Sequence, residues 1–195
     1  MGLSRSDWTE AALCALAESG LAGVAVDPLA RRLGATKGSF YWHFANLDEL
    51  IAATLVLWEQ RDTTEVIARL EAISDPRRRL LAVARFAYER AARGSGAQAG
   101  VLASASDPRV TPMLQRVTAT RLAYLVRLYV DLGLPPEEAH RHARLAYVLY
   151  VGLADLHRAA PGAIGPTDEP DDVALMIEAL TRLAGISSPP SPPSR

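Results

Sequence analysis

The stretch "LARRLGATKGSFYWHFANLDEL", residues 29–50, decides how this sequence is interpreted. Phe40 and Phe44 are four residues apart, so on a helix they share one face and form a small apolar core. Gly34 ends the preceding short helix, and Thr36 is placed to cap a helix that runs from about Lys37 to Phe44. Two short helices joined by a tight turn that contains glycine are typical of a helix-turn-helix.

The amino end of the second helix has the residue types that suit contact with a DNA duplex. Thr36 and Lys37 offer backbone N–H groups and a positive charge to a phosphate, and Ser39 can bond to a base edge. Three consecutive residues after Phe40 cannot all face one small core, so at least one of them is exposed. We therefore predict a recognition helix over residues 36–43, with these DNA contacts: Thr36, Lys37, Gly38, Ser39, Tyr41, Trp42 and His43.

The bulk composition restricts the class of protein. The chain has 195 residues, a formal net charge of −1 and a single cysteine, which excludes an intramolecular disulfide and fits a reducing compartment. No apolar run is long enough to span a membrane, and the sequence predicts a cytoplasmic protein that needs no cofactor and binds no metal. Residues 1–50 carry four basic and six acidic residues, so a basic footprint for DNA exists only locally, between Pro28 and Ala45.

Apolar residues recur at spacings of three and four along almost the whole chain, which predicts an all-α protein of about nine helices. A three-helix DNA-binding domain is expected at residues 1–45. A second helical domain is expected at residues 46–186, and its first helix lies within residues 46–72. Asp107 and Pro108 open one long helix of this domain, a last helix carries Val173 to Leu183, and residues 187–195 are a disordered tail.

The segment Arg144–Leu156, "RLAYVLYVGLADL", is apolar almost all round and must be covered on more than one side. A second copy of the chain would provide that cover, and so would a position inside a monomer. The first alternative predicts a two-fold interface from this helix and the last one, with these residues: Tyr150, Leu153, Met176 and Leu180.

The quoted stretch resembles the DNA-binding signature of TetR-family transcriptional repressors, and the resemblance covers residues 8–58. It is carried by Leu29-Ala30, by Gly34 to Gly38 and by Tyr41 to Phe44. The resemblance implies a homodimer that binds a palindromic double-stranded operator. It also implies that residues 46–186 form the domain for ligand binding and dimerisation, with residues 46–72 as the connecting helix. A small-molecule inducer in the C-terminal helices would then change the spacing of the two recognition helices.

Two positions depart from the family pattern. Ala25 stands where the family often has Ser or Thr at the start of the second helix, so Asp27 is expected to cap that helix. Leu47 stands where the family often has Lys. Both changes remove contacts to phosphate and predict modest affinity with a shallow dependence on salt.

The inducer site is predicted from apolar walls with a few polar groups on the central helices. The candidates are Trp58, Phe86, Leu102, Arg121, Tyr124, His142 and Tyr147. Two other functions stay open. An enzyme is disfavoured because no nucleophile motif or metal-ligand spacing is present, and a helical adaptor that contacts protein fits the low basic charge.

Overall fold

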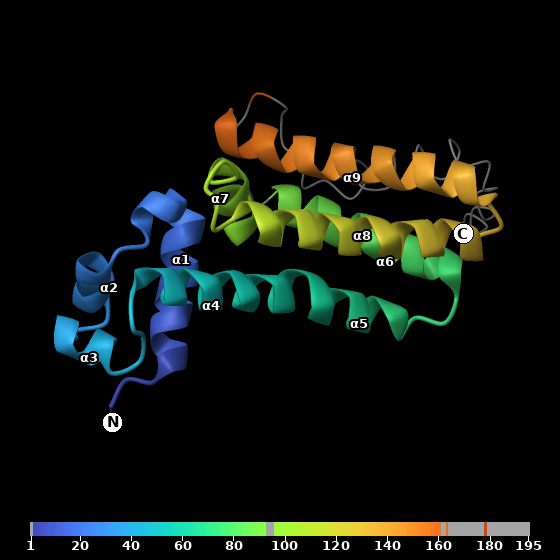
Figure 1. Cartoon of the computed structure of the whole chain (residues 1–195). Coiled ribbons are helices and arrows are strands. Elements are labelled where there is room, and N and C mark those ends of the chain that lie inside the picture. Colours follow the sequence, from blue (N-terminus) through green and yellow to red (C-terminus); the bar gives the residue numbers. More distant parts are fainter. Residues whose placement is uncertain (1, 93–95, 161–162, 164–177, 179–195) are drawn as a thin grey trace, which may run out of the picture. The chain divides into compact units, whose positions relative to one another are not determined.

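The computed structural model describes residues 2–92, 96–160, 163 and 178, and every regular element in these ranges is helical (Figure 1). The predicted all-α class is therefore confirmed. The helices are α1 Arg5–Ser19, α2 Val26–Arg32, α3 Lys37–Tyr41, α4 Leu47–Glu59, α5 Glu65–Glu71, α6 Pro76–Ala92, α7 Ala97–Ala103, α8 Thr111–Asp131 and α9 Pro136–Ala159. A 3-10 turn, Leu21–Gly23, lies between α1 and α2.

α4 and α5 are continuous, because the π-helical turn Gln60–Thr64 joins them without a break. Counting this long helix once leaves eight separate helices in the described residues, close to the predicted number. The helix expected at Val173–Leu183 falls, except for Glu178, outside the described residues, as does the tail at residues 187–195.

The chain divides into two compact units. One comprises Met1–Ala68 and Ser95–Arg121, and the other comprises Arg69–Gly94 and Leu122–Arg195. The first unit contains the quoted stretch. The functional division at residues 45 and 46 stays a prediction.

The first unit is built around α1, which packs against α4 and α7. Its largest fully buried side chains come from helices distant in sequence, and they are Trp8, Leu16, Phe40, Phe44, Leu50 and Trp58. α7 approaches α1 closely because Gly100 has no side chain: a Cβ built at Gly100 would lie 1.8 Å from the Leu16 carbonyl oxygen. This core fixes the orientation of α3 within the unit.

The helix starts follow local hydrogen bonding, with three corrections to the expected boundaries. Ser4 caps α1 in a capping box with Asp7. The cap of α2 is Ala25, without a side-chain hydrogen bond, so the expectation that Asp27 caps this helix is wrong. α8 begins at Thr111, because the Asp107 carboxylate binds the backbone N–H and the side chain of Arg109 and holds a turn there. α3 ends at Tyr41, three residues earlier than expected.

The second unit contains α6 packed against α9. Ala139 and Ala143 of α9 are fully buried, while several of its apolar side chains are exposed. The exposed ones are Leu145, Val148, Leu149 and Leu156, which share one face of the helix. The prediction that this helix needs cover on a second side therefore agrees with its surface.

Candidate nucleic-acid interface

The turn between α2 and α3 is closed by backbone hydrogen bonds. Gly34 has φ +62°, a left-handed conformation that glycine adopts without strain. The N–H of Ala35 donates to the Ala30 carbonyl at 2.8 Å, and the N–H of Gly34 donates to the Arg31 carbonyl at 3.2 Å, as in a Schellman motif. The chain then enters α3, where Thr36 Oγ1 accepts from the Ser39 N–H at 3.3 Å. The glycine and the cap predicted from the sequence both have these roles.

One face of α3 is held in the core by aromatic contacts. The Phe40 ring stacks on Phe44 at 5.6 Å and meets the edge of Trp8 at 5.4 Å. The Arg5 guanidinium lies 4.1 Å from the centre of the Phe44 ring. These contacts leave the opposite face of α3 in solvent.

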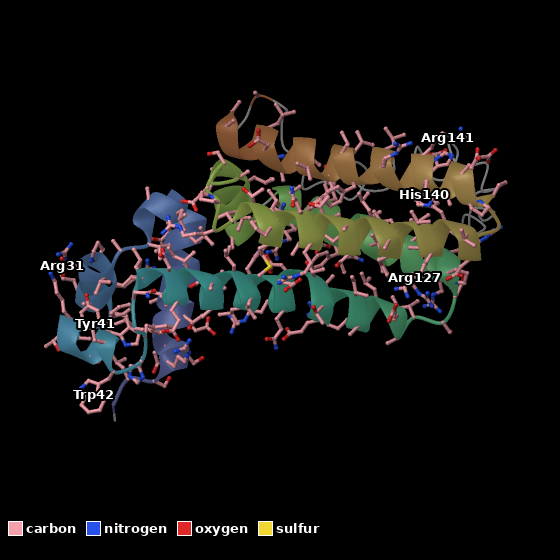
Figure 2. The ribbon with its side chains drawn as sticks, viewed as in Figure 1. Arg31, Tyr41, Trp42, Arg127, His140 and Arg141 are labelled. Carbon is pink, nitrogen blue, oxygen red and sulfur yellow. The ribbon has the colours of Figure 1, made fainter. Side chains whose placement is uncertain are left out.

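The exposed face carries the predicted DNA contacts. Trp42 is 88% exposed and Tyr41 is 61% exposed, whereas His43 and Ser39 are half-buried. Thr36, Lys37 and Gly38 are exposed at the amino end of α3. Figure 2 shows Arg31, Tyr41 and Trp42 projecting along one edge of the α2–α3 segment. All seven predicted residues therefore lie on one short helix and the turn that follows it, although their contact with DNA stays a prediction.

Lys37 forms an ion pair with the helix that precedes it. Its Nζ lies 2.8 Å from Asp27 Oδ1, and both side chains are more than half exposed. The hydrogen bond that Lys37 donates to the Asp27 carboxylate raises the pKa of Lys37, so the lysine is cationic at neutral pH. The only lysine of the chain thus has an intramolecular carboxylate that competes with any phosphate.

Arg31 is a surface residue that the sequence did not single out. Its neighbour Arg32 binds both carboxylate oxygens of Glu18, at 2.7 and 2.8 Å, and Arg5 binds Glu49. Arg31 is exposed, and no carboxylate of the described residues pairs with it. Sequence alone could not distinguish the two adjacent arginines, because the pairing of Arg32 depends on how α1 lies against α2.

The predicted ligand-binding residues are distributed over both units. Trp58, Leu102 and Arg121 belong to the first, and the Arg121 guanidinium lies 5.5 Å from the Trp58 ring. The second unit holds four more, which are Phe86, Tyr124, His142 and Tyr147. His142 lies beside Tyr129, with ring centres 5.7 Å apart. These residues stay candidates for a ligand site.

A recess of about 500 Å³ lies in the second unit between the carboxyl-terminal part of α8, Arg79 and Glu71. Tyr124 is the one predicted ligand residue that lines it. Charged side chains surround the opening, since Arg127 pairs with Glu71 at 2.9 Å and Arg79 with Asp131 at 3.7 Å. The recess thus combines charged groups with apolar side chains of α8, namely Val126, Leu128 and Val130.

The predicted dimer residues lie on α9 or beyond the described chain. Tyr150 and Leu153 are half-buried, and Met176 and Leu180 lie outside the described residues. The exposed apolar face of α9 runs through Leu145, Val148 and Leu149 instead.

The described residues lack the features of two other classes of site. No helix there combines the length and the hydropathy of a membrane-spanning segment. Within the same part of the chain, no three His, Cys, Asp or Glu residues gather as a metal-binding group would require.

Comparison with known proteins agrees with this geometry. Residues 9–54 match the family described as bacterial regulatory proteins, tetR family. The resemblance predicted for residues 8–58 is therefore confirmed, and the matched residues include α3. No curated protein matches the chain significantly.

Solved structures match over nearly the whole chain. A transcriptional regulator from Rhodococcus sp. Rha1 is 22% identical with a TM-score of 0.67, covering 96% of this chain and 100% of that one. The reduced form of E. coli NemR is 14% identical with a TM-score of 0.73, covering 91% and 95%. A TetR variant from Acinetobacter baumannii AYE in complex with minocycline is 23% identical with a TM-score of 0.52, covering 94% and 95%. At these identities the likeness establishes the fold.

Proposed function

We propose that this protein is a ligand-responsive transcriptional regulator, most simply a repressor, that binds a palindromic operator as a homodimer. The observation that carries the proposal is the exposed edge of α3, where Thr36, Lys37 and Trp42 face solvent on a helix whose other face is locked into the core. A recognition helix needs this combination, because the base edges of the major groove are reached only by side chains that point away from the protein.

The residues of this edge divide into two roles. The amino end of α3 with Lys37 binds a phosphate, and Ser39 reads a base edge. Tyr41 and Trp42 lie against the sugar-phosphate backbone, with Arg31 adding a cation to the same edge. Contacts to phosphate set the orientation, and the few residues left for bases set the sequence preference.

Two copies of the chain are needed to bind two half-sites. The two recognition helices must meet major grooves about 34–36 Å apart, or at a multiple of that distance. The apolar face of α9 supports an interface, because four exposed apolar side chains in a row are unfavourable in water. In this interface Tyr150 and Leu153 flank the exposed row, and Met176 and Leu180, which lie outside the described residues, are the two other predicted contacts.

A small molecule bound among the C-terminal helices would release the operator. The minocycline complex of the Acinetobacter protein supports this part, since a protein of the same fold binds a small molecule. α4 is placed to transmit the change within its unit, because its cap Asn46 lies two residues after Phe44 and Asp48 pairs with Arg109 at 2.7 Å. Differential affinity of the ligand for two dimer states would lower the affinity for DNA.

The decisive test of DNA binding is Lys37→Ala. Fluorescence anisotropy with the duplex upstream of the coding region should show loss of specific binding, while circular dichroism and sedimentation stay unchanged. Arg69→Ala is the matched control, because it removes an equally exposed cation from another helix. Unchanged operator binding by Lys37→Ala would contradict the assignment. If binding to every duplex is independent of the salt concentration, the alternative of a helical adaptor that contacts protein is favoured instead.

The dimer is tested separately by Val148→Asp, together with Tyr150→Arg and Leu153→Arg. Sedimentation velocity should show monomers for these variants and a dimer for the wild type. Ala119→Arg serves as the control, because it adds a charge at an exposed position on another helix. Dimers in all three α9 variants would place the interface elsewhere.

A further inference from the structure

Arg121 of α8 is enclosed by neutral hydrogen-bond acceptors. Its Nε donates to Thr63 Oγ1 at 2.9 Å, and its Nη1 donates to Gln98 Oε1 at 2.7 Å. Its Nη2 donates to the Asp62 carbonyl at 3.0 Å. Three elements of one unit, namely α8, α7 and the π-helical turn Gln60–Thr64, therefore converge on one half-buried guanidinium.

This guanidinium has no carboxylate partner among the described residues. Other arginines of the same unit do: Arg61 pairs with Glu10, and Arg116 pairs with Glu59 at 2.7 Å. Charged groups that are withdrawn from water are nearly always paired, because the loss of hydration is otherwise uncompensated. Arg121 is thus a cation whose local counter-charge is missing.

Buried donors beside Arg121 also lack acceptors. Trp58 is fully buried and Gln98 is 4% exposed, yet neither the Trp58 Nε1–H nor the Gln98 Nε2–H₂ group has a hydrogen-bond partner. The Gln98 amide is oriented by its bond to Arg121, and the Trp58 ring centre lies 5.5 Å from the Arg121 Cζ. A guanidinium has five N–H groups, so two of those on Arg121 remain after its three bonds. The cluster therefore has unused donors around one positive charge.

The turn that supplies two of the acceptors has an unusual conformation. π-helical turns inside α-helices are uncommon and are frequently found at functional sites, because the inserted residue weakens the regular ladder of hydrogen bonds. Here the turn provides Thr63 and the Asp62 carbonyl to Arg121. A site that serves only packing would not require an arginine at this point.

We infer that Arg121, Gln98 and Trp58 form a binding site for the carboxylate group of a small apolar molecule. A carboxylate has the single negative charge and the several acceptor positions that the cluster lacks. A cationic head group is excluded by the charge of Arg121, and a phosphate dianion would leave one charge uncompensated.

This inference rests on the proposed function, in which the carboxylate compound is the inducer. The site can influence DNA binding because the π-helical turn continues the same helix that begins with Asn46 beside the recognition segment. A carboxylate that draws Arg121 toward itself changes the hydrogen bonds at Thr63 and Asp62. The conformation of the turn, and with it the length of α4, then depends on the ligand.

Isothermal titration calorimetry of the full chain tests the site with acetate, butyrate, octanoate, benzoate and phenylacetate, each compared with its uncharged amide. At least one carboxylate should bind about 10- to 100-fold more tightly than its amide, the range expected for a charge-assisted pair of hydrogen bonds. Arg121→Gln should remove this preference. Arg116→Gln, five residues earlier and exposed, should keep it.

Trp58→Phe gives a second variant at the site, because it removes the unpaired N–H and keeps one aromatic ring. The smaller side chain leaves a cavity and lowers the thermal unfolding temperature, so binding is measured well below that temperature, where circular dichroism shows the variant folded; carboxylate binding should weaken several-fold. Equal affinity for carboxylates and amides, no binding of any carboxylate at millimolar concentration, or full binding by Arg121→Gln would each overturn the inference.

Operator binding measured on the same samples separates the two hypotheses. If the ligand-free protein binds the operator but no carboxylate binds to the protein, this inference is wrong and the proposed function stands. If carboxylates bind in a way that depends on Arg121 but the protein binds no DNA, the carboxylate site is supported and the proposed function as a transcriptional regulator is wrong.

Discussion

The ion pair between Asp27 and Lys37 gives the sharpest prediction about DNA binding. Asp27→Asn removes the carboxylate that lies 2.8 Å from Lys37 Nζ and preserves the shape of the side chain. Exposed ion pairs contribute little to folding, and Asp27 makes no capping bond to α2, so the unfolding temperature should not change measurably. The substitution therefore affects the interface without affecting the fold.

The size of the effect follows from the number of phosphates that become available. In the wild type, a phosphate that binds Lys37 must displace Asp27 or share the lysine with it. In the variant each subunit gains about one phosphate contact, or about two for the dimer, and each contact steepens the slope of log K against log salt by about 0.9. Between 200 and 50 mM salt, the affinity of the variant should therefore rise by about 12-fold more than that of the wild type.

Fluorescence anisotropy titrations over a series of KCl concentrations measure this slope on operator and on random duplex. Affinity should increase for both duplexes, because the added contact is to phosphate and carries no sequence information. The ratio of specific to non-specific affinity should therefore not improve. Glu71→Gln is the matched control, since it removes an exposed carboxylate from an ion pair with Arg127 in the other unit.

The reasoning would be refuted by an unchanged slope, or by weaker operator binding in Asp27→Asn. An unchanged slope would mean that Lys37 does not meet a phosphate. Weaker binding would mean that Asp27 orients the lysine in the complex and does not compete with DNA.

Three further substitutions test the fold and the interface. Gly100→Ala should destabilise the protein by about 2 kcal/mol or more in urea unfolding, because the new Cβ would lie 1.8 Å from the Leu16 carbonyl oxygen; unaltered stability would contradict the close approach of α1 and α7. Trp42→Ala should weaken DNA binding at least about 10-fold without changing the unfolding temperature, since the side chain is 88% exposed, and full affinity would exclude Trp42 from the interface. Burial raises the pKa of Tyr129 to about 12 from an ordinary value of 10.0. As the pH rises, the unfolded chain therefore loses this proton before the folded protein does, and the free energy of unfolding should fall between pH 10 and 12. Tyr129→Phe should remove up to about 1.4 kcal/mol per pH unit of that fall, and an identical pH profile in the variant would show that the hydroxyl is not buried.

Much of the DNA-binding segment was predictable because its signals are local. The spacing of Phe40 and Phe44, the left-handed Gly34 and the Thr36 cap involve residues at most five apart. Each of them has the predicted role in the structure. The same holds for the start of α4 at Asn46, whose side chain accepts from the Glu49 N–H at 2.9 Å. Backbone hydrogen bonds and caps act over one helical turn, so the residue order contains the information.

Other boundaries depended on competing local contacts. Asp107 and Pro108 have the residue types of a helix start, but Asp107 bonds to Arg109, and its pKa falls to about 2 because of these hydrogen bonds. Ala25 begins α2 without a side-chain cap, since tertiary packing of Leu29 and Ala30 stabilises this short helix. Capping preferences are too weak to decide such cases by themselves.

The sequence by itself determined the helical class, the turn before α3 and the cap of α3, because periodicity and capping depend on neighbours along the chain. Only the tertiary structure decided which charged side chains are paired with a carboxylate of the same chain and which are not. Lys37 is paired with Asp27 and Arg32 with Glu18, whereas Arg31 has no partner among the described residues and Arg121 meets only neutral acceptors there. The pairs of Lys37 and Arg32 and the contacts of Arg121 join residues 10 to 59 positions apart, so these partners are fixed by how the helices pack and not by the order of residues.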